Sequence, residues 1–259
     1  MTEKPNDSQE IGKLFIVATP IGNLEDITLR ALRILKEVDV IACEDTRVTS
    51  KLLAHYSISK PLVSYHQHSK DNKTEALLEK MLSGANIALV TDAGTPGVSD
   101  PGNQLVEIAI KNQIQVVPIP GSSALATIVS VSGIDMQKFV FWGFPPHKKG
   151  RETFFKEVAA QKIPTVYYDS PHRVLKNLQL LQELCACHPA PDAGSSKSHK
   201  LENNLDSRLR GNDNAKKIII GREMTKMFEE IVRGNLAEVL EYFSQNPTKV
   251  KGEFVVVVY

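Results

Sequence analysis

The sequence predicts an α/β fold with a mainly parallel sheet in its first half. Short apolar runs alternate with segments whose apolar residues recur at helical spacing, and this alternation is typical of strand–helix–strand units. Loops rich in glycine, proline and small polar residues follow several of the apolar runs, at the position where α/β sheets bind their ligands. The length of 259 residues suits one large domain or two of ordinary size.

The first half contains apolar runs with the length of buried strands. These predicted strands are 14–17, 38–42, 62–66, 87–90 and 115–119. Helices are predicted after Asp26, at 48–55, at 74–82, at 103–112 and after 120–124. Asp26 has the right position to cap the first of these helices, and Gly84 to end the third. We therefore expect an N-terminal α/β domain over residues 13–120.

The second half has a different pattern, in which strands and helices alternate less regularly. The predicted strands are 139–143, 165–168, 217–220, 230–234 and 251–259, and the predicted helices are 152–161, 174–184 and 236–243. We expect these elements to form a C-terminal α/β domain over residues 121–259.

Two segments lack apolar residues in periodic array, namely 1–12 and 188–215. Such segments cannot bury enough apolar surface to offset the entropy of ordering them. We expect a disordered N-terminal tail and a disordered, passive insert. The alternative for the insert is an arm that binds nucleic acid, since basic residues outnumber acidic ones in its second part.

The composition excludes several classes of protein. The 31 basic and 30 acidic residues leave a net charge of +1, so any binding of nucleic acid must come from a local patch. Three cysteines are too few for a secreted disulfide scaffold. No apolar stretch approaches the ~20 residues that span a bilayer, and the polar N-terminus lacks a signal-peptide core. We expect a cytoplasmic protein.

Common catalytic motifs are missing from the sequence. It contains no dinucleotide-binding G-x-G-x-x-G, no P-loop, no G-x-S-x-G and no H-E-x-x-H. Cys185 with Cys187, and His66 with His68, each lack further ligands for a metal site, so no metal is expected. Activity must therefore come from the loops at the ends of the predicted strands.

The glycine-rich loop 91–102 carries the most information of these. Its glycines permit positive φ and close approach to a ligand, while Pro96 and Pro101 stiffen it. Backbone amides in such loops bind an adenosyl cofactor or a phosphate without a charged side chain. Taken alone, the loop fits a well-made turn equally well.

Several loops together resemble a known family. The residues that carry the resemblance are 18–28 (ATPIGNLEDIT), 43–47 (CEDTR), 92–102 (DAGTPGVSDPG), 120–124 (PGSSA), 170–173 (SPHR), 221–226 (GREMTK) and 251–253 (KGE). They resemble the tetrapyrrole methylase superfamily of S-adenosylmethionine-dependent methyltransferases, most closely its branch that methylates the ribose of ribosomal RNA. The similarity covers residues 11–187 and 216–259. Porphyrin-methylating members have a G-x-G-x-G-type loop where this chain has Thr19–Asn23, and this departure favours the RNA branch.

The resemblance implies a two-domain fold with a mainly parallel N-terminal sheet, a mixed C-terminal sheet and S-adenosyl-L-methionine in the cleft between the domains. It also implies a homodimer that acts on the small ribosomal subunit or its 16S rRNA, and methylation of the ribose 2′-oxygen of a cytidine in the decoding region. The expected cofactor contacts are Pro20, Gly94, Thr95, Pro96, Val98, Ser123, Ala124, Tyr168 and Met224. The reason is steric, because the cofactor needs a concave, mostly apolar pocket with backbone amides. The alternative for each glycine or proline is turn geometry alone.

Basic residues near the predicted strand ends are candidates for binding RNA. They are Arg47, Lys148, Lys149, Arg151 and Arg173. Arginine matches phosphate in a bidentate way, and such contacts position an RNA without reading its sequence. Trp142 and Phe144 lie next to the basic loop, where a splayed base can stack. The alternatives are a tryptophan in the core and lysines on a solvated loop.

Methyl transfer to a hydroxyl needs a group that accepts the hydroxyl proton. Glu44 and Asp100 are our first candidates, followed by Asp45 and His66, all at predicted strand ends. The alternatives are that Asp100 caps the following helix and that Glu44 pairs with Arg47.

Two other functions compete with an RNA methyltransferase. The first is a tetrapyrrole methyltransferase on the same fold, and the second is a non-catalytic protein that binds an adenosyl ligand. The basic loop 148–151 favours RNA, whereas a wide apolar cleft would favour a tetrapyrrole.

Overall fold

The computed structural model describes residues 10–66, 71–100, 102–187 and 216–259. Most of the predicted tail and the whole predicted insert lie outside these residues. Contacts divide the chain into two compact units, Met1–Ser130 with Met224–Met227, and Val131–Glu223 with Phe228–Tyr259. The division falls near the end of helix α5 (Ala124–Val131), beyond the boundary that we placed at residue 120.

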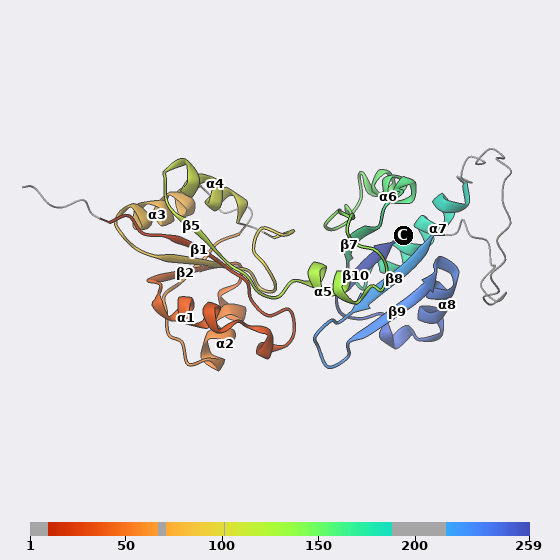
Figure 1. Ribbon diagram of the computed structural model, residues 1–259, viewed down its shortest axis with the longest axis horizontal. Helices are drawn as coiled ribbons and strands as arrows, with labels where there is room; N and C mark the ends of the chain where they lie inside the picture. Colours follow the sequence, from red (N-terminus) through yellow and green to blue (C-terminus); the bar gives the residue numbers. More distant parts are fainter. Residues whose placement is uncertain (1–9, 67–70, 101, 188–215) are drawn as a thin grey trace, which may run out of the picture. The chain divides into compact units, whose positions relative to one another are not determined.

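The first unit is built on a parallel sheet with the strand order β3-β2-β4-β1-β5 (Figure 1). The strands are β1 (Leu14–Val17), β2 (Val40–Cys43), β3 (Leu62–Ser64), β4 (Ile87–Val90) and β5 (Val116–Ile119). Every neighbouring pair is parallel. The predicted parallel sheet is therefore confirmed, with each strand within a few residues of its expected place.

Helices cover both faces of this sheet. They are α1 (Leu29–Glu37), α2 (Thr46–His55), α3 (Asp71–Leu82) and α4 (Asn103–Lys111). α1 and α2 pack on one face around Ile34, Leu35 and Leu53, and α3 and α4 pack on the other face around Leu77 and Leu105. Because both faces are buried, the strands are apolar throughout rather than alternating.

The start of α1 differs from the prediction. Asn23 caps a short 3₁₀ turn, η1 (Leu24–Asp26), and the Thr28 hydroxyl caps α1 by accepting from the amide of Ala31 at 3.0 Å. The prediction that Asp26 is the helix cap is wrong, because the 3₁₀ turn uses Asp26 as its last residue and the helix begins after an extended Ile27.

The second unit contains a mixed sheet with the order β6-β7-β10-β8-β9. Its strands are β6 (Val140–Phe141), β7 (Thr165–Asp169), β8 (Lys217–Arg222), β9 (Glu230–Asn235) and β10 (Phe254–Val258). Only the β6–β7 pair is parallel among these strands of the described chain. The helices α6 (Arg151–Ala160), α7 (Val174–Cys187) and α8 (Leu236–Gln245) share one core with the sheet, and η2 (Pro247–Lys249) follows α8. The predicted mixed sheet is confirmed.

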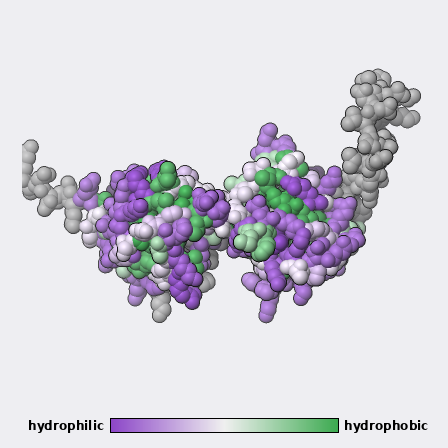
Figure 2. Space-filling view, turned by 90° about the horizontal axis from the view of Figure 1, so that it is seen from below, coloured by the Kyte–Doolittle hydropathy of each residue, from purple (hydrophilic) through white to green (hydrophobic). Residues whose placement is uncertain are grey.

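The described helices are all too short or too polar to cross a membrane. On the face seen in Figure 2, the surface of each unit is largely hydrophilic, with hydrophobic side chains gathered in limited areas.

Candidate active site

The first unit has a topological switch point between β4 and β1. The chain leaves β1 through α1 toward β2, and it leaves β4 through α4 toward β5, so the two connections run to opposite sides of the sheet. In open α/β sheets, ligands bind beyond the carboxyl ends of the strands at such a point. The loops that follow these strands are 18–28 and 91–102, the two that the sequence analysis singled out.

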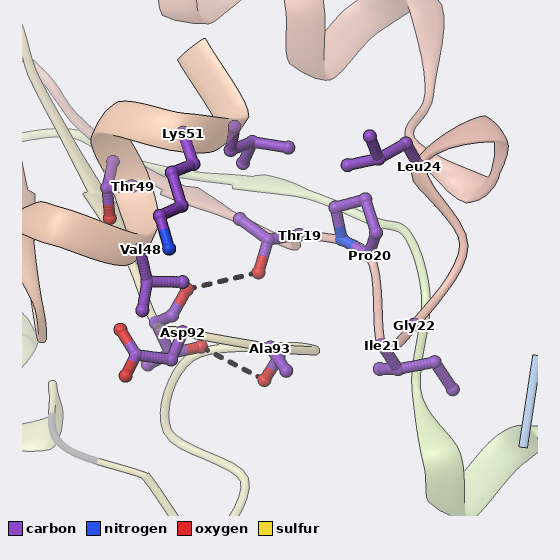
Figure 3. Close-up of a pocket in the computed structure, with 12 residues that line it drawn as sticks. Thr19, Pro20, Ile21, Gly22, Leu24, Val48, Thr49, Lys51, Asp92 and Ala93 are labelled. Atoms are coloured by element: carbon purple, nitrogen blue, oxygen red, sulfur yellow. Dashed lines mark hydrogen bonds between the residues drawn. The ribbon is translucent and has the colours of Figure 1, made fainter. Parts of the chain in front are cut away.

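The two loops are bound directly to each other. The amide of Thr19 donates to the carbonyl of Gly94 at 2.9 Å, and the amide of Gly94 donates back to the carbonyl of Thr19 at 3.0 Å. The Thr19 hydroxyl donates to the carbonyl of Thr91 at 3.1 Å and is buried (Figure 3). These bonds make the two loops one wall rather than separate turns.

The loop after β5 joins the same wall. The Thr95 hydroxyl donates to the carbonyl of Ser122 at 3.2 Å, and the Ser122 hydroxyl donates to the carbonyl of Asp26 at 3.1 Å. A Cβ atom on Gly121 would lie 2.9 Å from the Cβ of Ala18, so this close approach requires glycine. The structure thereby brings the candidates of the first three loops together: Pro20, Gly94, Thr95, Pro96, Val98, Ser123 and Ala124.

Met224 also belongs to the first unit, although strand β8 before it belongs to the second. It is buried, and its neighbours Thr225 and Lys226 pack on Gly22. A Cβ atom on Gly22 would lie 2.3 Å from Cγ of Lys226, so a larger residue would require the Lys226 side chain to move. The segment 224–227 is therefore a further part of the surface around loop 18–28.

The backbone of loop 91–102 is in unusual conformations. Gly94 has φ +82°, in the left-handed region that favours glycine. Ser99 has φ 66°, which is rare for a residue with a side chain and directly precedes Asp100. Such local strain is concentrated at functional sites.

Three carboxyl groups lie together at the carboxyl ends of β2 and β4. The amide of Asp45 donates to Oδ1 of Asp92 at 3.0 Å, which joins the loop after β2 to the loop after β4. Burial, and then the charge of Asp92, raise the pKa of Glu44 above its ordinary value. Burial, and then the charges of Glu44 and Asp92, raise the pKa of Asp100 to about 7. The two predicted catalytic carboxyls therefore interact, and Asp92 is a third member that the sequence analysis did not single out.

The structure shows neither of the two alternative roles, in which Asp100 caps the following helix and Glu44 pairs with Arg47. The helix after Asp100, α4, begins at Asn103 with Gly102 as its N-cap residue, and no side chain caps it by a hydrogen bond. Arg47 pairs with Asp45 rather than Glu44, with 2.5 Å between Nη2 and Oδ2, and its side chain is 86% exposed. His66 shares a 2.7 Å hydrogen bond with the hydroxyl of Ser64, and its interaction with Glu44 offsets only part of the rise in the pKa of that carboxyl.

A hollow of about 410 Å³ opens beside this wall, within the first unit (Figure 3). It is lined by residues of loop 18–28, of helix α2 and of the segment 91–93, and we call it the α2 hollow. Pro20 and Asp92 contribute to it from the loops, and Lys51 from α2. Lys51 could not be singled out from the sequence, because a single exposed lysine on a helix has no distinguishing pattern.

The second unit carries the other candidates. Tyr168 lies on β7, with its ring centroid 5.0 Å from that of Phe141 and 5.2 Å from that of Phe144. Trp142 is packed against the core and contacts Phe154, which favours its core role, whereas Phe144 is 52% exposed.

The basic candidates of the second unit lie near the loop before α6. Lys148 and Arg151 line a hollow of about 310 Å³ together with His147, and Lys149 is exposed beside them. Arg173 donates from Nη1 to the carbonyl of Pro145 at 3.0 Å. It thus anchors this basic loop to the start of α7.

Among the described residues, no group of three or more His, Cys, Asp or Glu side chains is arranged to hold a metal ion.

Comparison with known proteins places this geometry in a class. Residues 13–240 match the family model of tetrapyrrole (corrin/porphyrin) methylases, so the chain belongs to the tetrapyrrole methylase family. Similar solved structures include diphthine synthase, with a TM-score of 0.66, 13% identity and coverage of 95% of this chain and 89% of the other. Cobalt precorrin-4 methyltransferase matches with a TM-score of 0.62, 15% identity and coverage of 95% and 94%. These structures share the fold.

Sequence similarity is much stronger to one kind of protein within the family. The chain is 42% identical to the ribosomal RNA small subunit methyltransferase I of Halalkalibacterium halodurans, over 95% of this chain and 75% of that protein. It is 40% identical to the protein of the same name from Synechocystis, over 96% and 79%. The resemblance predicted from the loops is therefore confirmed.

Proposed function

We propose that this chain transfers the methyl group of S-adenosylmethionine to the ribose 2′-oxygen of a cytidine in the decoding region of 16S rRNA. The relatives that match over nearly the whole chain are named for methylation of small-subunit ribosomal RNA. The observation that carries the chemistry is the pair of interacting carboxyls, Glu44 and Asp100, beside the joined loops at the switch point.

The cofactor would be held mainly by the wall of joined loops. Backbone groups of Gly94 to Val98, with Pro20, Ser123 and Ala124, offer amides and small apolar surfaces, which suit an adenosyl ligand. The close approach at Gly121 and the left-handed Gly94 fit this role, because each keeps a side chain out of the wall. Tyr168 and Met224 would complete the contacts. The bound cofactor supplies an electrophilic methyl group on a sulfonium, and a solved relative of the fold, uroporphyrin-III C-methyltransferase of Thermus thermophilus, is described in complex with S-adenosylhomocysteine.

Asp100 would accept the proton of the ribose hydroxyl. A group with a pKa near the working pH is the most effective general base, and the pKa of Asp100 is about 7. As the 2′-oxygen takes the methyl group, its proton passes to the Asp100 carboxylate. Glu44 and Asp92 would keep Asp100 basic through their negative charge.

The RNA would be positioned by phosphate contacts. Lys148, Lys149 and Arg151 of the second unit supply exposed or half-exposed cations, and Arg173 holds their loop in place. Arg47 adds a cation on the first unit. We also propose that the enzyme is a homodimer and works in the cytoplasm, where its RNA substrate is found.

The proposal is tested by incubating the protein with methyl-labelled S-adenosylmethionine and small ribosomal subunits that lack the modification. Label should appear in 2′-O-methylcytidine after digestion of the RNA. A protein that binds the cofactor but labels no RNA would refute the proposal, and label in a tetrapyrrole precursor instead would establish the competing activity.

A further inference from the structure

The α2 hollow has the dimensions of a site for a small ligand. Its volume of about 410 Å³ falls within the ~300–1,000 Å³ of typical ligand pockets. Its walls are rigid, since Thr19 is tied to Gly94 and Thr91 by hydrogen bonds and helix α2 packs on the sheet through Leu53. The hollow is therefore a built feature of the first unit rather than a gap between mobile loops.

The lining combines apolar surface with one cation and one anion. Pro20, Ile21 and Val48 supply apolar surface, Lys51 supplies the cation and Asp92 the anion. Figure 3 shows the Lys51 side chain leaving α2 with its ammonium group directed into the hollow. Within the described part of the chain, Lys51 has no ion-pair or hydrogen-bond partner, whereas its helix neighbour Arg47 is paired with Asp45. An unpaired ammonium group beside apolar walls suits a ligand that contains both a phosphate, which pairs with the ammonium group, and a ring, which packs on the apolar walls.

Asp92 connects the hollow to the catalytic carboxyls. Its side chain lines the hollow, and its charge also acts on Glu44 and Asp100. One of its oxygens accepts from the amide of Asp45, which holds the carboxylate in place. A ligand in the hollow therefore contacts Asp92, whose charge acts on the group that we propose to accept the ribose proton.

We infer that the α2 hollow binds one nucleotide of the RNA substrate, with its phosphate at Lys51 and its ring against Pro20 and Val48. This inference rests on the proposed function. Single-stranded RNA is recognised through splayed bases that stack on side chains, and enzymes that act on a base take the nucleotide out of its stack into a pocket.

The position of the hollow distinguishes this nucleotide from the cofactor. The hollow is lined by α2, which follows β2, and by 91–93, the first part of the loop after β4. The proposed cofactor contacts lie in the later part of that loop, where Thr95 bonds to Ser122, and after β5, which is on the other side of β1 in the strand order. Pro20 belongs to both sets, so the two ligands would meet there.

The first test replaces the unpaired cation by Lys51→Met. We expect the Kd for an RNA fragment spanning the target to rise about tenfold, as for the loss of one hydrogen bond to a charged group. The slope of log Kd against log salt should fall by about 0.7, the value for one phosphate of a single strand. The Kd for S-adenosylhomocysteine should stay unchanged. Lys36→Met is the matched control, because Lys36 is an exposed lysine on α1 outside the hollow.

The second test fills the hollow by Val48→Trp. Val48 is 40% exposed, so the larger side chain can enter the hollow without disturbing the core. We expect methyl transfer to fall at least tenfold with cofactor affinity unchanged, while Ser50→Trp, on an exposed position of the same helix, keeps wild-type activity.

The outcomes separate this inference from the proposed function. If the wild-type protein methylates the RNA and both hollow variants match it in Kd, salt slope and rate, the inference is wrong and the proposed function stands. If the variants weaken binding of the cofactor instead of binding of the RNA, the hollow is part of the cofactor site and the inference is equally wrong. If the wild type transfers no methyl group to the RNA, the proposed function itself fails.

Discussion

Replacing Asp100 by asparagine should make the protein more stable and nearly inactive. The pKa of Asp100 rises from an ordinary 3.8 to about 7, first through burial and then through the charges of Glu44 and Asp92. The folded state therefore holds the Asp100 proton more tightly than the unfolded state. The stabilising contribution of the protonated group is complete below pH 3.8 and is lost as the pH rises through 7. An asparagine side chain at this position carries no charge at any pH and so escapes this loss.

The size of the effect follows from the two pKa values. Their difference, at about 1.36 kcal/mol per pKa unit, gives an upper limit of about 4 kcal/mol at pH 8. Asp100 is only half-buried, and solvent screening reduces this value, so we expect a gain of about 2 kcal/mol in the free energy of unfolding. The gain should shrink by roughly two-thirds toward pH 5, where most of the folded wild-type carboxyl is protonated.

Two measurements check this reasoning. Urea unfolding of the wild type and of Asp100→Asn at pH 5 and pH 8 gives the stability difference, with Glu75→Gln on the exposed face of α3 as a control. The second measurement is the rate of methyl transfer. The wild-type kcat/KM should rise about tenfold from pH 6 to pH 8, and the kcat/KM of Asp100→Asn should be about 10²–10⁴-fold lower, the usual contribution of a general base. An equal stability difference at both pH values, together with a flat pH profile of the wild type, would refute the argument.

Three further predictions concern other parts of the molecule. Gly94→Ala places a side chain at φ +82°, so it should cost about 1–2 kcal/mol of stability and weaken the binding of S-adenosylhomocysteine measured by calorimetry. Gly133→Ala is the control, because Gly133 has φ +74° with nothing within 4 Å. It should cost the same stability and leave the Kd for S-adenosylhomocysteine unchanged. Arg173→Ala removes the hydrogen bond to the carbonyl of Pro145, so the KM for RNA should rise several-fold while the affinity for the cofactor stays the same. An unchanged KM would contradict the anchoring role of Arg173. Glu230→Ala leaves the buried Arg222 without its ion-pair partner, so the free energy of unfolding, measured by chemical denaturation, should fall by about 2–4 kcal/mol. A loss below about 1 kcal/mol, the value of an exposed pair, would show that the pair is dispensable.

The alternation of apolar runs and helical patterns was enough to predict the parallel sheet of the first unit, whereas the mixed sheet of the second unit was expected from the family resemblance. It works in the first unit because a parallel sheet covered on both faces needs uniformly apolar strands, as in β4 (Ile87–Val90). It could not resolve the start of α1, where Asp26 and Thr28 are both good caps. The choice depends on the 3₁₀ turn at Leu24–Asp26, which only the folded loop defines.

The candidate site was predictable to the extent that it lies at strand ends. Carboxyl ends of parallel strands meet at one edge of a sheet, which is why Glu44 and Asp100 come together. Asp92 is the second residue after β4, as Glu44 is the first after β2, so the same signal applied to it. The packing of Lys226 on Gly22 could not be derived from sequence spacing, because it joins loops that are far apart in the chain. Lys51 was missed for a different reason, since its significance comes only from the hollow that it faces.

The acidic character of this site raises a difficulty for an enzyme that acts on a polyanion. A phosphate brought close to Asp92 adds negative charge near Asp100, which would raise the pKa of that carboxyl further and leave less of the active base at neutral pH. A cation at the same place opposes this, because it offsets the charge of the phosphate before that charge reaches the carboxyls. The unpaired Lys51, on the same hollow as Asp92 in the described part of the chain, has the position that this compensation requires. We therefore expect binding of the RNA and the basicity of Asp100 to be linked through Lys51, so that a carboxyl cluster can serve as the base beside a phosphate backbone.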